Sequence, residues 1–147
     1  MIGTYIGIRL TPESEAQLRN LFRAHFTRMI DDLHATIIYA PEDDVHHKFT
    51  PAPYRTFKAT VTGKDVFGKA GDKWEALVLK LDAPALSRRH EALKKVYKLR
   101  HSYPEFSPHI SIKYQPTSEE NKKFLEMDLA NFKLELAGEY IEPIQED

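Results

Sequence analysis

Six stretches of the chain are rich in β-branched, aliphatic or aromatic residues, and several of them alternate apolar with polar positions. A period of two is typical of β-strands with one face buried. The first stretch is an example, because Ile6, Ile8 and Leu10 alternate with Tyr5, Gly7 and Arg9. The pattern predicts strands over residues 4–10, 33–39, 57–66, 74–82, 108–114 and 132–141.

Three other stretches carry apolar residues at helical spacing. The first extends from the end of the first strand to residue 26, the second covers residues 85–100, and the third covers residues 117–129. Thr11 is placed to cap the first helix, and Thr117 with Glu120 matches a capping box at the start of the third. Each end signal lies where the apolar period changes, which supports the predicted boundaries.

The order of elements predicts one α+β domain over residues 1–147. Each half of the chain places a helix before a strand with a polar face, and such strands pair in antiparallel sheets whose other face meets the core. We therefore expect two lobes of antiparallel sheet, with helices packed outside and a groove between the lobes.

Composition narrows the classes of partner. The formal net charge is −1, whereas proteins that hold long nucleic acids usually carry a basic excess. The chain has no cysteine, which excludes disulfides, thiolate metal sites and a cysteine nucleophile. Neither a signal peptide nor a membrane anchor is visible at the N-terminus. A cytoplasmic protein with a small phosphate ligand is expected, with no membrane, long nucleic acid or obligate protein partner.

Two tripeptides of one pattern carry the candidate chemistry, His34-Ala35-Thr36 and His109-Ile110-Ser111. Each lies in a predicted strand, so its imidazole and hydroxyl point to the same face. Two such strands side by side would offer two titratable nitrogens and two hydroxyl donors, which suits acid–base chemistry on a phosphate without a metal or cofactor. One copy would more often be structural; the repeat favours catalysis.

The paired motifs resemble the 2H phosphoesterase superfamily, which is named for two His-x-Thr/Ser motifs facing each other across a groove. The resemblance implies a LigT-like fold and catalytic roles for His34, Thr36, His109 and Ser111. Residues 76–84, 103–109 and 138–140 are further similar to phage anti-CBASS phosphodiesterases, which degrade the cyclic oligonucleotide signals of bacterial immunity. That similarity implies a cyclic oligonucleotide ligand and, for a phage-encoded chain, action in the host cytoplasm.

Further residues are candidates for substrate binding beside the motifs. Trp74 is the only tryptophan and could stack on a base, or else be a half-buried core residue. The remaining candidates are polar or aromatic residues of the first, fifth and last strands. These are Tyr5 and Arg9, Lys113, and Glu139, Tyr140 and Glu142.

Three other functions remain open at this stage. The same chemistry could open 2′,3′-cyclic phosphates at RNA ends, and a non-catalytic protein could sequester a nucleotide with the same side chains. A metalloenzyme using His34 and His109 is disfavoured because no carboxylate or cysteine accompanies them. His46 and His47 lie in a polar loop that we expect to be mobile and to cover the groove, and His25, His90 and His101 are expected at the surface.

Overall fold

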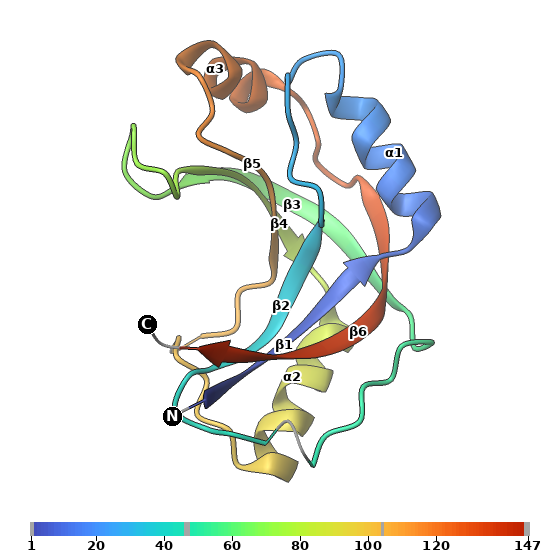
Figure 1. Ribbon diagram of the computed structural model, residues 1–147. Helices are drawn as coiled ribbons and strands as arrows, with labels where there is room; N and C mark the ends of the chain where they lie inside the picture. Colours follow the sequence, from blue (N-terminus) through green and yellow to red (C-terminus); the bar gives the residue numbers. More distant parts are fainter. Residues whose placement is uncertain (1, 46–47, 104, 146–147) are drawn as a thin grey trace.

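The computed structural model describes residues 2–45, 48–103 and 105–145, and these hold six strands and three helices (Figure 1). In chain order they are β1 (Ile2–Leu10), α1 (Pro12–Phe22), β2 (His34–Ala40), β3 (Phe57–Phe67), β4 (Ala76–Asp82), α2 (Pro84–Tyr97), β5 (His109–Tyr114), α3 (Ser118–Glu126) and β6 (Lys133–Gln145). The predicted α+β class and element order are confirmed. The largest boundary differences are α1, which ends four residues early at Phe22, and β6, which continues to Gln145.

All strand pairs are antiparallel, and they close into one barrel in the order β1-β2-β5-β4-β3-β6. The prediction of two separate sheets is therefore wrong. Two three-stranded halves are still distinguishable, β6-β1-β2 and β3-β4-β5. They join along β3 and β6 through four consecutive residue pairs, whereas the register between β2 and β5 consists of the pair Ala35 and Ile110 in the described residues. The halves thus meet loosely along the two strands that carry the His motifs.

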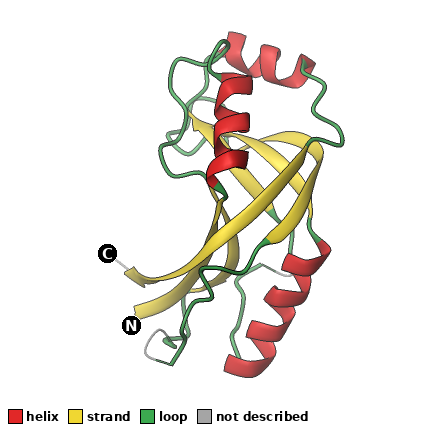
Figure 2. Ribbon diagram, turned by 90° about the vertical axis from the view of Figure 1, so that its right-hand side faces the viewer, coloured by secondary structure: helices red, strands yellow, loops and turns green. Residues whose placement is uncertain are grey.

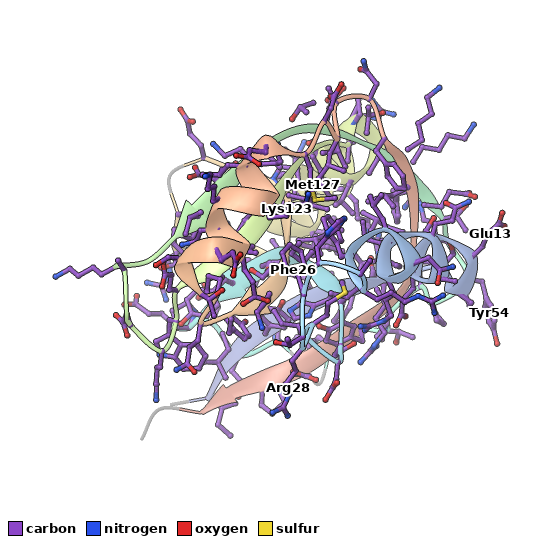
Figure 3. The ribbon with its side chains drawn as sticks, turned by 90° about the horizontal axis from the view of Figure 1, so that it is seen from above. Glu13, Phe26, Arg28, Tyr54, Lys123 and Met127 are labelled. Atoms are coloured by element: carbon purple, nitrogen blue, oxygen red, sulfur yellow. The ribbon has the colours of Figure 1, made fainter. Side chains whose placement is uncertain are left out.

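The helices cover the ends of the barrel. α1 and α3 lie at one end and α2 at the opposite end in both views (Figures 1 and 2). Phe26 follows α1 and packs between α1 and α3, with its ring centroid 5.3 Å from that of Phe22 and 6.3 Å from that of Phe124 (Figure 3). Phe26, the last residue of the predicted helix, is buried as part of the core but lies just after the turn that follows α1. No helix in the described parts of the chain is long and apolar enough to cross a membrane.

Both His strands contain a β-bulge one residue after the motif hydroxyl. On β2, Ile38 pairs with Ile6 and Thr36 with Gly7, so Ile37 is the extra residue. On β5, Lys113 pairs with Leu77 and Ser111 with Val78, which makes Ile112 extra. An extra residue reverses the alternation of faces beyond it. Tyr39 and Tyr114, each three residues after the motif hydroxyl, therefore join the face of the motif.

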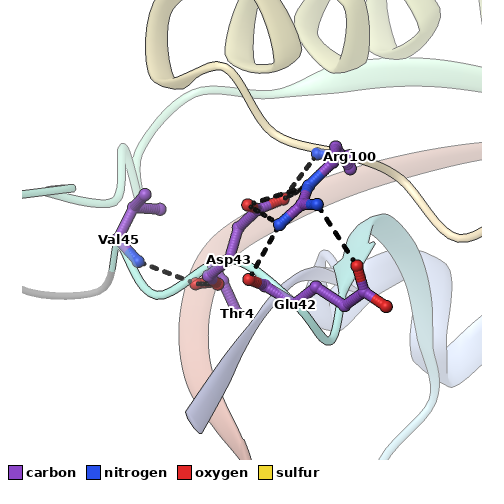
Figure 4. Close-up of polar contacts among 5 residues, drawn as sticks. All are labelled: Thr4, Glu42, Asp43, Val45 and Arg100. Atoms are coloured by element: carbon purple, nitrogen blue, oxygen red, sulfur yellow. Dashed lines mark hydrogen bonds and ion pairs between the residues drawn. The ribbon is translucent and has the colours of Figure 1, made fainter. Parts of the chain in front are cut away.

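The loop after β2 is tied down on both sides in its described part (Figure 4). The backbone N–H of Arg100 donates to Asp43 Oδ2 at 2.7 Å, and its guanidinium lies 2.9 Å from Asp43 Oδ1. On the other side, Thr4 Oγ1 donates to the carbonyl of Asp43 at 2.6 Å. Phe49 is buried further along the loop. These anchors oppose the expectation of a free lid over residues 41–53; His46 and His47 lie outside the described residues.

Candidate active site

The two motifs meet across the β2–β5 contact. Because Ala35 lies opposite Ile110 in antiparallel register, His34 comes opposite Ser111 and Thr36 opposite His109. The histidines thus occupy one diagonal and the hydroxyls the other, and diagonal positions in such a pair are about 7–8 Å apart. All four side chains line one cavity of about 40 Å³. A single water needs about 10–15 Å³, so this cavity has room for a small tetrahedral group between the imidazoles.

Each imidazole is oriented in the same way. His34 Nδ1 lies 2.9 Å from the carbonyl oxygen of Asp32, and His109 Nδ1 lies 2.9 Å from that of Ser107. A carbonyl can only accept, so Nδ1 carries the proton in both rings. In the neutral ring Nε2 then holds a lone pair, and in the charged ring it holds a transferable proton. The two backbone contacts leave Nε2 of both histidines for chemistry.

Tyr5 places a hydroxyl against the first motif. Its Oη and Thr36 Oγ1 share a hydrogen bond of 2.9 Å, and its ring meets that of His34 edge-on at 6.1 Å between centroids. Burial raises the pKa of Tyr5, and the hydrogen bonds to Thr36 and Tyr140 only partly oppose this. Burial also raises the pKa of Tyr140, helped by Tyr5 beside it. Both phenols therefore remain protonated at neutral pH.

A glycine makes room for Tyr140. A Cβ built on Gly7 would lie 2.5 Å from the Tyr140 hydroxyl, closer than real Cβ contacts come. β1 and β6 also shift register between Gly7 and Arg9, which face Tyr140 and Ala137. The absence of a side chain at position 7 lets the tyrosine ring of β6 lie across β1.

An open cleft of about 490 Å³ continues from the small cavity on the His34 side. It shares His34, Thr36, Ser111 and Tyr114 with that cavity. Of the candidates for substrate binding, Tyr5, Tyr140 and Glu142 line this cleft. The structure thus gathers them around the motifs.

Sequence reasoning missed Tyr114, which lines both the cavity and the cleft. A strict period of two assigned the groove face to Lys113 instead, and the bulge at Ile112 exchanges the two. One signal could have found it, since both strands share the longer spacing His-x-Thr/Ser-x-x-Tyr, whose last residue is Tyr39 on β2 and Tyr114 on β5.

Lys113 is held away from the groove and is not in a position to bind the substrate, contrary to the expectation from the sequence. Its side chain is buried, its Nζ donates to the carbonyl of Arg28 at 2.9 Å, and it lies 3.6 Å from Glu120 Oε2. These contacts with the segment before β2 and with α3 occupy the ammonium. Lys113 is not a solvated strand end either, because only 6% of the residue is exposed.

Glu139 likewise lies on the face opposite Tyr140 and Glu142. Its carboxylate is buried and accepts hydrogen bonds from the Arg89 guanidinium at 2.7 Å and from the backbone N–H of Ala52 at 3.0 Å. The group joins α2, β6 and the loop before β3. Glu139 therefore has a structural role in place of the expected contact with the substrate.

Arg9 and Trp74 lie at the periphery of the site. Arg9 forms an exposed ion pair with Asp32 at 3.2 Å and sits over the Tyr140 ring, 4.0 Å from its centroid. Trp74 is 62% exposed and meets Tyr114 edge-on at 5.7 Å, while Lys73 lies 5.0 Å from its ring centroid. Its exposure excludes the half-buried core alternative.

The described residues contain no cluster of side chains that could bind a metal ion. No group of three or more histidine, aspartate or glutamate side chains comes together there.

Comparison with known proteins identifies the family. The family model for the anti-CBASS protein Acb1 matches residues 2–147. The chain belongs to the Acb1 family of anti-CBASS proteins. The anti-CBASS protein Acb1 of Vibrio phage KVP40 is 33% identical over 149 residues, which cover 97% of this chain and 87% of the phage protein.

Membership of the Acb1 family confirms the resemblance to phage anti-CBASS proteins expected from residues 76–84, 103–109 and 138–140. The wider assignment to the 2H phosphoesterases stays a prediction that rests on the two motifs. The part of the chain that matches the family model, residues 2–147, includes both motifs.

Proposed function

We propose that the chain is a metal-independent phosphodiesterase that hydrolyses 3′-5′ bonds of cyclic di- and trinucleotide messengers, such as 3′,3′-cyclic GMP-AMP. Its role would be to counteract CBASS immunity, as the family description suggests, and its place of action would be the host cytoplasm. One observation carries the proposal: two histidines with identically fixed Nδ1 atoms line one small cavity together with two hydroxyls.

The proposed reaction divides proton transfer between the two rings. Nε2 of the neutral histidine takes a proton from the attacking oxygen, which is either a water or the ribose 2′-OH. The new P–O bond forms as the P–O5′ bond breaks, and Nε2 of the protonated histidine gives its proton to the departing 5′ oxygen. Attack by the 2′-OH leaves a 2′,3′-cyclic phosphate, and the diagonal geometry lets either histidine take either role.

The hydroxyls would stabilise the charge that develops on the non-bridging oxygens. Tyr5 stays protonated and can donate to Thr36 Oγ1, which frees the Thr36 proton for the phosphate. Ser111 takes the equivalent place on β5. Because Tyr5 donates to Thr36 Oγ1, the Thr36 hydroxyl is already oriented before the substrate binds.

The charge around the site supports a small ligand. Neither lysine nor arginine is among the six residues that line the 40 Å³ cavity, Ile30, His34, Thr36, His109, Ser111 and Tyr114. Affinity for a long nucleic acid comes mainly from many basic contacts to phosphates. The proposed substrate needs instead one phosphodiester at the imidazoles and contacts for the nucleosides beside it.

The decisive test is turnover of a panel of cyclic di- and trinucleotides in EDTA, with products identified by mass spectrometry. We expect cleavage by the wild type and a loss of roughly a hundred- to ten-thousandfold in rate for His34→Ala and His109→Ala. His25→Ala, at an exposed histidine outside the site, is the matched control and should keep full activity.

Three outcomes would overturn the proposal. Return of intact ligand after denaturation of a tight complex would identify a sequestering protein. Faster opening of 2′,3′-cyclic phosphates at RNA ends would identify the RNA-end enzyme, and activity only with added divalent metal would exclude the metal-free mechanism.

A further inference from the structure

A second pocket opens from the small cavity on the side of His109. Its volume is about 360 Å³, within the range of about 300–1,000 Å³ usual for small-molecule sites. Its walls include Tyr39, Phe67, Tyr103 and Phe106. Aromatic side chains on several sides are the setting in which nucleobases bind, since every base offers a π-face.

The pocket is continuous with the proposed reaction centre. Thr36 and His109 line both the pocket and the 40 Å³ cavity. The ring of Phe67 on β3 meets that of His109 at 5.1 Å between centroids. A phosphodiester in the cavity would therefore place one of its nucleosides in this pocket and the other in the cleft lined by Tyr5 and Tyr140.

The pocket is built on a fixed frame. Tyr39 donates its N–H to His101 Nδ1 at 3.1 Å, and its carbonyl accepts from the backbone N–H of Ser102 at 2.8 Å. His90 stacks on Phe106 with centroids 4.1 Å apart and contacts the Ile37 carbonyl through Nδ1 at 2.7 Å. The two histidines thus satisfy backbone groups around the β2 bulge and hold the wall in place.

Among the described residues that line this pocket, Glu105 is the one carboxylate, and no lysine or arginine is present. A carboxylate accepts hydrogen bonds at two oxygens and, when ionised, donates none. The Watson–Crick edge of guanine presents two adjacent donors, N1–H and the N2 amine, which a carboxylate can accept together. Adenine presents one amine beside the N1 lone pair, which would face the carboxylate with no proton to offer.

We propose that this pocket is a nucleobase subsite that selects guanine through Glu105 and stacks it on Tyr39 and Tyr103. The subsite deepens the proposed function, since it assigns a guanine nucleoside to the His109 side of the cleaved phosphodiester. Its binding can be tested without turnover, which keeps the two proposals separable.

The test is titration of the isotope-labelled protein with 5′-GMP and with 5′-AMP, followed by amide NMR. We expect tighter binding of GMP, with the largest shifts at Tyr39, Tyr103 and Phe106. Glu105→Gln should weaken GMP about tenfold and leave AMP nearly unchanged, because it removes the charge-assisted acceptor. Glu119→Gln makes the same charge change on α3 and should alter neither affinity.

A second variant addresses stacking. Tyr103 is 61% exposed, so Tyr103→Leu should stay folded and weaken GMP and AMP alike, by about tenfold. Equal affinity of the wild type for GMP and AMP, or shifts confined to the cleft at Tyr5 and Tyr140, would overturn the subsite. So would an identical response of Glu105→Gln and Glu119→Gln. Selective GMP binding without cleavage of any cyclic nucleotide would sink the enzyme and keep the subsite.

Discussion

His101 accepts a hydrogen bond at Nδ1 from the backbone N–H of Tyr39, and it can do so only while that nitrogen is unprotonated. Burial, with His90 and Lys94 nearby, lowers the pKa of His101 to about 4. Burial also lowers the pKa of His90. His90 and His101 are therefore both neutral in the folded protein at pH 7.

The lowered pKa of His101 predicts that the folded protein loses stability in acid. From about pH 6.5 down to about pH 4 the unfolded chain binds a proton at His101 that the folded chain does not. Its contribution to stability is complete above pH 6.5 and is lost as the pH falls through that window. His101→Asn keeps an acceptor for Tyr39 but cannot titrate, so its unfolding temperature should fall less steeply between pH 6.5 and 4. Thermal unfolding by circular dichroism checks this, and His25→Asn should retain the wild-type slope.

Tyr5 and Thr36 should behave as a coupled pair. Tyr5→Phe removes the partner of Thr36 and should lower kcat about two- to tenfold, the value of one hydrogen bond. Thr36→Val should lower kcat about ten- to a thousandfold. The double variant should be no slower than Thr36→Val, because Tyr5 acts through that hydroxyl. Additive losses measured in single-turnover assays would show that Tyr5 acts independently of Thr36.

Gly7→Ala should displace Tyr140 and with it the wall of the cleft. The new methyl group would lie 2.5 Å from the Tyr140 hydroxyl, so the Tyr140 side chain, which also contacts Tyr5, would have to move. We expect a higher KM for the cyclic nucleotide and amide shifts at Tyr5 and Tyr140. Gly63→Ala, where the nearest atom lies 4.0 Å away, is the matched control. Unchanged kinetics in Gly7→Ala would remove Tyr140 from the substrate-binding wall.

Glu139 should matter for stability and not for base recognition. Glu139→Ala leaves Arg89 without its buried partner, which costs about 3–5 kcal/mol when such a pair is broken. Glu15→Ala breaks a more exposed pair with Arg19 and should cost about 0.3–0.5 kcal/mol. Urea unfolding separates the two values. A folded, fully stable Glu139→Ala protein with altered base preference would restore the ligand-binding role.

Trp74→Ala should stay folded, because the side chain is largely exposed. If the indole stacks on a base, its loss should weaken ligand binding by about 1–3 kcal/mol and raise KM more than it lowers kcat. Isothermal titration with a cyclic dinucleotide and catalytically inactive protein measures the binding term. An unchanged dissociation constant would leave Trp74 without a role in binding.

Much of the fold was predictable because the local signals agree with the tertiary structure. The capping box at Thr117 and Glu120 forms as the sequence indicates, with both reciprocal hydrogen bonds present. Closure of the barrel was not predictable, since it depends on the four pairs between β3 and β6, which are far apart in the sequence. The burial of His90 was also missed, because a single histidine on a helix face carries no signal for the Ile37 carbonyl that it contacts.

Prediction of the site residues succeeded where apolar and polar positions alternate regularly along a strand, and it failed beyond a bulge. His34, Thr36, His109 and Ser111 precede the bulges, so strict alternation assigned them correctly to one surface of the structure. Lys113 follows a bulge and was assigned to the wrong face. Glu139 was grouped with its neighbours although it alternates with them, and its partner Arg89 is 50 residues away in the sequence.

Among the described residues, β2 and β5 are paired at one position, Ala35 and Ile110. Each half of the barrel contributes one histidine, and the firm joint between the halves lies elsewhere, along β3 and β6. The spacing of the two imidazoles therefore depends on the β2–β5 contact beside them and, at a distance, on how β3 and β6 hold the two halves. We therefore expect substitutions along β3 and β6 to change the distance between the imidazoles without altering any residue that lines the cavity.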